Sequence, residues 1–239
     1  MTAPTPEAIR AIHRHLRAWL GPLRPPRRTD PLEELILTVL SQHTSDANSE
    51  RAYAALCKRF PTWDAVVRAR TRTVADTIRS GGLANTKAAR IRAILREIHQ
   101  REGSFDLSWM RNSPDDEVVA YLRSLPGVGP KTVAVVQAFA LGRPTIPVDT
   151  HVHRVSRRLG LVPQKASAEV AHRILEDVVP SRLKVGMHVG LITLGREVCK
   201  AGRPRCEECP LAEVCPTAPT VLAARATPGE PSGPPMSDE

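Results

Sequence analysis

Two residues whose side chains could do chemistry lie near the starts of two successive predicted helices. Lys131 and Asp149 are separated by a mostly apolar segment. A neutral lysine amine is a nucleophile, and the dipole at a helix start tends to lower the pKa of the amine. A carboxylate at Asp149 could stabilise a developing cation or exchange a proton with that amine. Each residue also has an ordinary interpretation, as a surface lysine and as a helix N-cap.

The segment before Lys131 predicts a helix, a hairpin and a second helix. Gly127 and Gly129 flank Val128 and permit positive φ, so consecutive backbone N–H groups could converge on one phosphate. We expect a helix over residues 114–124 and a second, largely buried helix from Pro130, since proline suits the first helical position. The pattern therefore predicts a phosphate-holding turn directly before Lys131.

Four cysteines near the end of the chain have metal-ligand spacing. Cys199, Cys206, Cys209 and Cys215 follow the pattern C-x6-C-x2-C-x5-C, which can bring four thiolates to one centre. Disulfides are disfavoured because no secretory signal is visible. Zinc and iron–sulfur clusters both accept four cysteines, and the ligand set alone does not separate them. The fifth cysteine, Cys57, is predicted to be a small buried hydrophobe.

Composition restricts the class of protein. The 239 residues carry a net charge of +9, which suits a polyanionic partner, and 41% of them are hydrophobic. No apolar run reaches membrane-spanning length, so we expect a soluble protein with no membrane association. Aromatic residues make up 3% of the chain, which argues against extended base stacking of the kind seen in single-strand binders.

The hairpin, the Asp149 segment and the cysteine loop together resemble the endonuclease III family of helix-hairpin-helix DNA glycosylases. The resemblance covers about residues 30–216. It is carried by Leu-Pro-Gly-Val-Gly-Pro-Lys-Thr at 125–132, Pro-Thr-Ile-Pro-Val-Asp-Thr-His at 144–151, Leu-Gly-Arg at 194–196 and the four cysteines. Each element alone is moderately specific, whereas their occurrence in this order is highly specific.

The resemblance implies a function and a cofactor. Lys131 would be the nucleophile, Asp149 the essential carboxylate, and the four cysteines the ligands of one [4Fe-4S] cluster per chain. The implied activity is that of a bifunctional DNA glycosylase/AP lyase of base excision repair, which removes oxidised pyrimidines through a lysine Schiff base and nicks the strand by β-elimination. The implied partner is double-stranded DNA that contains damaged bases or abasic sites.

The resemblance also implies a set of DNA contacts, with two departures from the family pattern. The implied contacts are Gln42, His43, Leu83, Gly127, Val128, Gly129, Thr132 and His151. His43 replaces a glutamine that fills the gap left by the flipped base, and Ala84 replaces a tyrosine, while Leu83 remains as an apolar wedge. The alternative for Gln42 and His43 is a solvated turn at a helix end.

The histidines after Asp149 do not predict a metal site. His151 and His153 are two residues apart, so on a helix they do not face each other. We expect them to cap the helix, pack or contact phosphate.

The chain is predicted to be all-α, with a two-lobed helix-hairpin-helix glycosylase fold and an iron–sulfur cluster loop. Residues 31–143 would form a six-helix lobe, residues 1–30 and 144–216 a discontinuous cluster lobe, and residues 217–239 a disordered tail. Further helices are predicted over 31–40, 46–59, 62–70, 73–79, 87–101, 167–179 and 182–198.

The first 20 residues have an amphipathic pattern, with Ile9, Ile12, Leu16 and Trp19 at helical spacing. We interpret this segment as a structural helix, with an organellar transit peptide as the alternative. The expected protein is a monomer in the cytoplasm, associated with the nucleoid. Two other functions remain open: a noncatalytic module of the same fold that senses DNA structure or redox state, and a zinc-stabilised DNA binder.

Overall fold

The computed structural model describes residues 4–23 and 29–226, and these contain helices and no strands, which confirms the all-α prediction. The α-helices are α1 (Pro6–Leu20), α2 (Pro31–Ser41), α3 (Asp46–Arg59), α4 (Trp63–Arg68), α5 (Thr71–Thr77), α6 (Ala84–Glu102), α7 (Asp115–Ser124), α8 (Pro130–Val135), α9 (Thr150–Arg158), α10 (Ala168–Val178), α11 (Lys184–Glu197) and α12 (Ala218–Ala226). Within these ranges, none of the helices has the length and apolar character needed to cross a bilayer.

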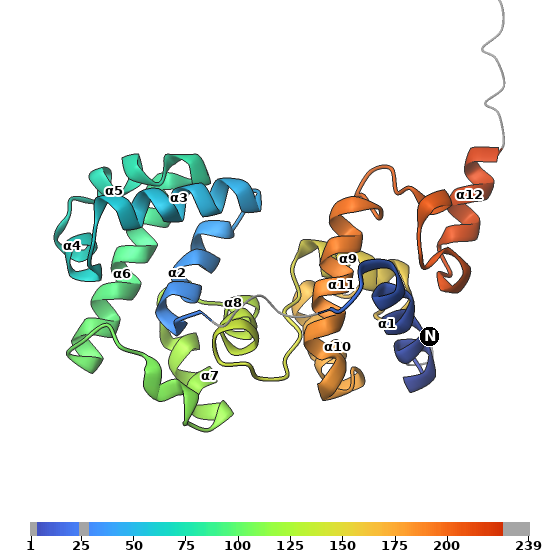
Figure 1. Ribbon diagram of the computed structural model, residues 1–239, viewed down its shortest axis with the longest axis horizontal. Helices are drawn as coiled ribbons and strands as arrows, with labels where there is room; N and C mark the ends of the chain where they lie inside the picture. The colour runs from blue at the N-terminus through green and yellow to red at the C-terminus, as the bar shows by residue number, and fades with distance from the viewer. Residues whose placement is uncertain (1–3, 24–28, 227–239) are drawn as a thin grey trace, which may run out of the picture.

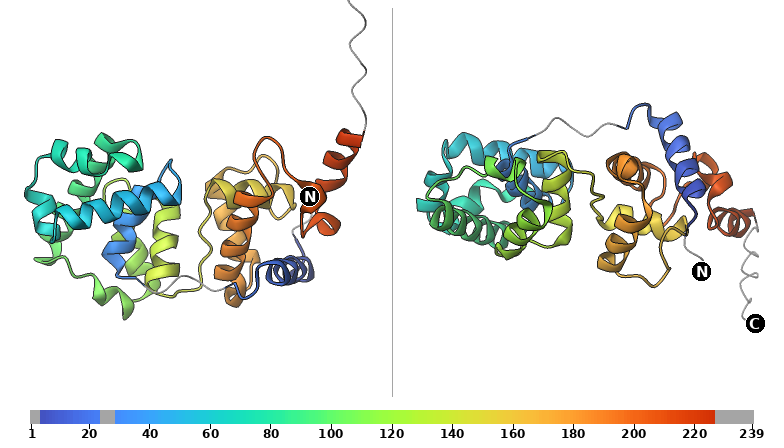
Figure 2. Two further views of the ribbon diagram at one scale, coloured as in Figure 1. Left: turned by 45° about the horizontal axis from the view of Figure 1, so that its top comes forward. Right: turned by 90° about the horizontal axis from the view of Figure 1, so that it is seen from below.

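The helices form two lobes that lie side by side in Figures 1 and 2. The first lobe contains α2 to α8, and its hydrophobic cluster ends at Leu141. The second lobe contains α9 to α11 together with α1, and its cluster takes up the chain again at Ile146. Residues 31–143 hold seven α-helices, one more than the six predicted for this lobe, and α4 and α5 are separate as their predicted ranges indicate.

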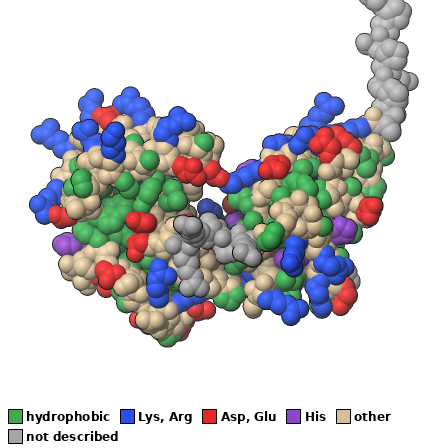
Figure 3. Space-filling view, in the orientation of Figure 1, with side chains coloured by type: hydrophobic (Ala, Val, Ile, Leu, Met, Phe, Trp, Pro, Cys, Tyr) green, Lys and Arg blue, Asp and Glu red, His purple; other side chains and the backbone are tan. Residues whose placement is uncertain are grey.

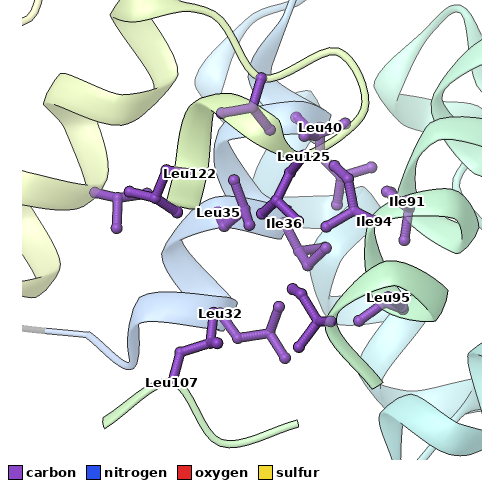
Figure 4. Close-up of a cluster of buried hydrophobic side chains, with 14 of the residues drawn as sticks. Leu32, Leu35, Ile36, Leu40, Ile91, Ile94, Leu95, Leu107, Leu122 and Leu125 are labelled. Atoms are coloured by element: carbon purple, nitrogen blue, oxygen red, sulfur yellow. The ribbon is translucent and has the colours of Figure 1, made fainter. Parts of the chain in front are cut away.

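Helix α2 runs through the centre of the first lobe. Leu32, Leu35, Ile36 and Leu40 are buried on it, and their side chains meet those of α6 in the cluster of Figure 4. A helix that is apolar on nearly all sides must be surrounded by other elements. The two polar exceptions on the buried part of this helix, Glu34 and Thr38, lie on the wall of the cavity described below.

Helix α1 belongs to the second lobe although it begins the chain. Ile9, Ile12 and Leu16 are buried on one face, in agreement with the amphipathic pattern. The helix packs on α11 so closely that a Cβ built at Gly190 would lie 2.8 Å from Leu16 Cδ1. Any larger residue at position 190 would push the two helices apart.

The helices around the hairpin differ locally from prediction. Helix α7 begins at Asp115, one residue later than expected, because Pro114 keeps an extended ψ of 152° and acts as the N-cap. Helix α8 ends at Val135 and continues as a π-helical segment over Val136–Ala140. The predicted buried helix is therefore present, with its last five residues in a wider turn.

Two further predictions are corrected. The tail was predicted to be disordered from residue 217, but α12 covers its first part, where Ala218 is buried and Arg225 donates to Glu207 and to the carbonyl of Pro204. The remaining predicted tail, 227–239, lies outside the described residues. Cys57 is exposed and not buried, because it falls on the outer face of α3 beside Lys58.

Candidate active site and cluster loop

The hairpin has the backbone conformation that its glycines predict. Gly127 has a φ of +70°, and the Val128 amide donates to the Leu125 carbonyl at 3.2 Å. The Arg90 guanidinium packs against Gly127, and it also donates to Gln42 Oε1 at 2.7 Å. Arg90 therefore ties the hairpin to the segment that follows α2.

Two of the predicted DNA contacts in this region have little exposed side chain. Val128 and Thr132 are buried in the first lobe, whereas Gly127 is exposed and Gly129 is partly exposed. Any contact by Val128 or Thr132 with a phosphate must therefore use mainly the backbone. Because Thr132 lies in the first turn of α8, its N–H belongs to the group that has no partner within the helix.

Replacing Gly127 with alanine is expected to destabilise the protein by about 1–3 kcal/mol. The new Cβ would combine a positive φ with a contact 2.4 Å from Arg90 Nε. Gly129 provides the matched control, because its φ is −99° and a Cβ there meets no atom within 4 Å. Urea unfolding of the two variants measures the difference, and equal losses of stability would contradict this account of the hairpin.

Lys131 and Asp149 line the same cavity, which has a volume of about 530 Å³ and lies between the lobes. The first lobe contributes Glu34, Thr38, His43 and Lys131 to its wall, and the second contributes Asp149, His188 and Arg196. In Figure 3 an opening separates the two halves at the top of the view, with acidic and basic side chains facing each other across it. The structure therefore brings the two predicted catalytic side chains to one site.

The Lys131 amine is withdrawn from solvent without a fixed partner. Among the described residues, no hydrogen bond to its Nζ is found, and no carboxylate forms an ion pair with it within the 4.0 Å limit. Burial lowers the pKa of Lys131, and the negative charges of Asp149 and Glu34 oppose that change. Burial is the largest cause of the shift.

The lowered pKa of Lys131 can be measured directly. The chain has six lysines, so after reductive methylation with ¹³C-formaldehyde each dimethylamine should give a resolvable NMR signal. We expect the Lys131 signal, identified by its loss in Lys131→Ala, to titrate at lower pH than the ordinary range of lysine amines. The free amine fraction then rises at a lower pH than for an ordinary lysine. Titration of the Lys131 signal within the ordinary range would contradict the assignment.

Asp149 caps helix α9 and remains open to the cavity. Its Oδ1 accepts the Val152 amide at 2.7 Å, as an N-cap does. His188 holds the segment that leads to Asp149 in place, since the His188 Nδ1–H donates to the Pro147 carbonyl at 2.7 Å. Burial lowers the pKa of His188 to about 4, so its ring is neutral and Nε2 is left as an acceptor.

An ion pair joins the lobes at the cavity wall. Arg196 Nη1 lies 2.5 Å from Asp46 Oδ2, and Nη2 donates to Oδ1 at 2.9 Å. The pair is bidentate, but both side chains are substantially exposed, which limits its contribution to stability. Its position, with one partner at the start of α3 and the other on α11, links the lobes across the opening.

The two predicted gap-filling residues share an uncommon backbone conformation. His43 has a φ of +53° and Leu83 a φ of +47°, and within 4–23 and 29–226 no other non-glycine residue has positive φ. Leu83 is also 56% exposed. Strained, exposed apolar residues are typical of contact sites. The buried Lys87 ammonium joins their two segments, because it donates to the carbonyls of Leu40 (2.6 Å) and Gly81 (2.7 Å).

Gln42, His151 and His153 have different surroundings. Gln42 accepts from Arg90, so its side chain is engaged in the protein. His151 lines the cavity, and its Nδ1 lies 3.2 Å from Arg154 Nη2. His153 Nε2 donates to the Ala166 carbonyl at 2.8 Å. The two histidines therefore have separate partners.

The four cysteines of the loop surround a second, small cavity. Cys199, Cys206, Cys209 and Cys215 all line a space of about 20 Å³ between the loop, α9, α11 and α12, and none of them is in a disulfide. Burial raises the pKa of Cys206, and the nearby Cys199 and Cys215 add to that rise. Among the described residues, no group of three or more Cys, His, Asp or Glu side chains has the arrangement to hold a metal ion.

The surroundings of the thiols nevertheless fit an anionic iron–sulfur group. Arg158 Nη1 lies 3.2 Å from Cys199 Sγ, and the rest of the cavity wall is largely apolar. A cationic donor and an apolar shell are the features that stabilise and shield a thiolate-bound cluster. The space of about 20 Å³ requires the thiols to move outward when a cluster binds.

Comparison with known proteins identifies the family. Residues 36–181 match the family described as HhH-GPD superfamily base excision DNA repair protein. Residues 199–215 match the iron-sulfur binding domain of endonuclease III, so the cysteine loop is an iron–sulfur site. The chain is 37% identical over 190 residues to endonuclease III of Escherichia coli K12. The aligned region covers 78% of this chain and 84% of that protein.

Other relatives and solved structures agree. Endonuclease III of Thermotoga maritima is 35% identical over 189 residues, covering 79% of this chain and 84% of its own length. A trapped endonuclease III–DNA covalent intermediate is 30% identical, with a TM-score of 0.79 over 92% of this chain and 99% of the other. The chain spans 64% of a relative from Arabidopsis thaliana that is 36% identical to it. This protein belongs to the endonuclease III family of the HhH-GPD superfamily.

Proposed function

We propose that this protein is a bifunctional DNA glycosylase/AP lyase that removes oxidised pyrimidines from double-stranded DNA in base excision repair. Lys131 is the nucleophile and Asp149 the essential carboxylate. The observation that carries the proposal is the partly buried Lys131 amine, which has a lowered pKa, no ion-pair partner within 4–23 and 29–226, and a carboxylate on the wall of the same cavity. The trapped covalent intermediate of a related endonuclease III with DNA supports the same class of reaction.

The chemistry follows from these two side chains. The Lys131 amine attacks C1′ of the flipped nucleotide, and the C1′–N bond breaks so that the base leaves with the electron pair and is protonated. The sugar ring then opens to a Schiff base between Nζ and C1′. Loss of a proton from C2′ expels the 3′ phosphate and nicks the strand. Asp149 stabilises the positive charge that develops on the sugar and accepts the proton that the amine loses.

The cluster is proposed to be [4Fe-4S], held by Cys199, Cys206, Cys209 and Cys215. When bound, it supplies a covalent cross-link that joins the loop to the end of α11. Exposed Leu83 and His43, on segments tied together by Lys87, would occupy the gap left by the flipped nucleotide.

A base-release screen tests the proposal. Duplexes that each carry one oxidised pyrimidine, one abasic site or no lesion are incubated with the iron-loaded protein, and released base and strand cleavage are measured separately. We expect base release and nicking with oxidised pyrimidines, nicking at the abasic site, and neither with intact DNA. Equal binding of all duplexes without base release would instead favour the noncatalytic module.

A further inference from the structure

Two polar side chains interrupt the apolar surface of α2 inside the cavity. Glu34 and Thr38 are four residues apart and therefore lie one above the other on the same face of the helix. Glu34 is 7% exposed and Thr38 is 3% exposed, and both line the cavity that contains Lys131. Polar groups in such a position cost stability unless they have partners.

Glu34 has one well-formed side-chain hydrogen bond and can accept more. The Thr29 hydroxyl donates to Glu34 Oε2 at 2.7 Å, and the two carboxyl oxygens together have the capacity to accept further donors. Burial raises the pKa of Glu34, and the Thr29 hydroxyl and the positive charge of Lys131 oppose that rise. The carboxyl group lies close enough to the proposed nucleophile to feel its charge, but among the described residues the two form no ion pair.

Thr38 places a hydroxyl next to the carboxyl group of Glu34. Its hydroxyl lies close enough to the Glu34 carboxyl to oppose the rise in the Glu34 pKa as a hydrogen-bond donor would, but among the described residues its buried oxygen has no hydrogen bond of good geometry. A hydroxyl can donate as well as accept, whereas an ionised carboxylate only accepts. Because the hydroxyl can rotate from the Glu34 carboxyl toward the cavity, the two side chains can present an acceptor and a donor to a base that enters.

We propose that Glu34 and Thr38 form a base-reading pair that selects a flipped pyrimidine with an amino group at C4, that is, an oxidised cytosine. This inference rests on the proposed function. Glu34 accepts from the exocyclic N4–H, and the Thr38 hydroxyl donates to N3. A flipped base is read at this edge in other base-flipping enzymes by the same kinds of hydrogen bond.

An oxidised uracil presents the opposite pattern at the same edge. Its O4 is an acceptor where cytosine has the N4–H donor, and its N3–H is a donor where cytosine has an acceptor. The base cannot slide to compensate, because its sugar must stay within reach of Lys131. The O4 of an oxidised uracil would then face the Glu34 carboxylate. Two acceptors would oppose each other in a buried site, and neither would have a hydrogen bond, which costs binding free energy.

The test compares 5-hydroxycytosine with 5-hydroxyuracil, each opposite guanine in the same duplex. These lesions differ at the C4 edge, so effects on Lys131 cancel in the ratio of the two kcat/KM values. We expect the iron-loaded wild type to favour 5-hydroxycytosine by about tenfold or more. In Glu34→Gln the ratio should fall by about tenfold, since the amide N–H₂ can donate to O4. Thr38→Val should reduce it to a smaller extent.

Glu33→Gln is the matched control, because Glu33 lies on the same turn of α2 and is exposed. It removes the same charge outside the cavity and should leave the ratio unchanged. Thermal melts establish that each variant is folded.

The outcomes separate this inference from the proposed function. Release of both bases by the wild type at equal kcat/KM, or an unchanged ratio in both Glu34→Gln and Thr38→Val, overturns the base-reading pair while the glycosylase activity stands. Absence of base release and of abasic-site nicking overturns the proposed function itself.

Discussion

Lys131→Ala is expected to lose covalent trapping on lesion-containing duplex in borohydride by about three orders of magnitude or more. Borohydride reduces the Schiff base between Nζ and C1′, so a chain without the amine has nothing to trap. The lysine is withdrawn from solvent without an ion-pair partner, and its removal therefore relieves desolvation and breaks no salt bridge. We expect the melting temperature to stay the same or rise.

Lys58→Ala is the control for this experiment, because Lys58 is an exposed lysine on α3 and outside the cavity. It should trap DNA as the wild type does. Undiminished trapping by Lys131→Ala, measured by gel shift of the denatured complex, would remove Lys131 from the role of nucleophile. A loss of trapping together with a large fall in melting temperature would attribute the effect to folding instead.

Cys206→Ser is expected to abolish the visible absorption of the cluster and to destabilise the protein by about 4 kcal/mol or more. Cys206 is the most buried of the four thiols, and its loop has only short 3₁₀ turns of its own. Without the cross-link, Leu211 is the main apolar anchor of this loop in the cluster of the second lobe. Iron and sulfide analysis should fall from about four of each per chain to below one.

Cys57→Ser is the matched control, since it makes the same substitution at a cysteine outside the loop. Its thiol is exposed on α3, in the other lobe, so iron content, absorption and stability should match the wild type. A colourless native protein that contains zinc in place of iron would overturn the iron–sulfur assignment. Full iron content in Cys206→Ser would show that this thiol is not a ligand.

The parts of the site that could be predicted from sequence depend on short contiguous segments. Lys131 follows its hairpin directly, and Gly127 takes the positive φ that a glycine there suggests. Asp149 caps a helix whose apolar periodicity is visible in the sequence. Local conformation and side-chain identity are both encoded within a few residues in these cases. The amphipathic pattern of α1 likewise gave the correct buried face.

The parts that could not be predicted depend on contacts between distant segments. Nothing in the sequence around Arg90 shows that it packs on Gly127 and donates to Gln42, because these contacts arise from tertiary packing. The same is true of His188, which holds Pro147 from a separate helix. Glu34 had a visible signal, since a polar pair four residues apart is unusual in so apolar a helix. To predict that Cys57 is exposed, one would have to know which face of α3 it lies on.

The place of α1 has a consequence for synthesis of the chain. The helix completes its cluster only with α11, and 163 residues lie between the end of one and the start of the other. At roughly 5–20 residues per second, ribosomes need about 8–30 s to make that stretch. Throughout that interval Ile9, Ile12 and Leu16 lack their partners on α11. The nascent chain therefore offers the apolar face of an amphipathic helix to chaperones before the second lobe can close.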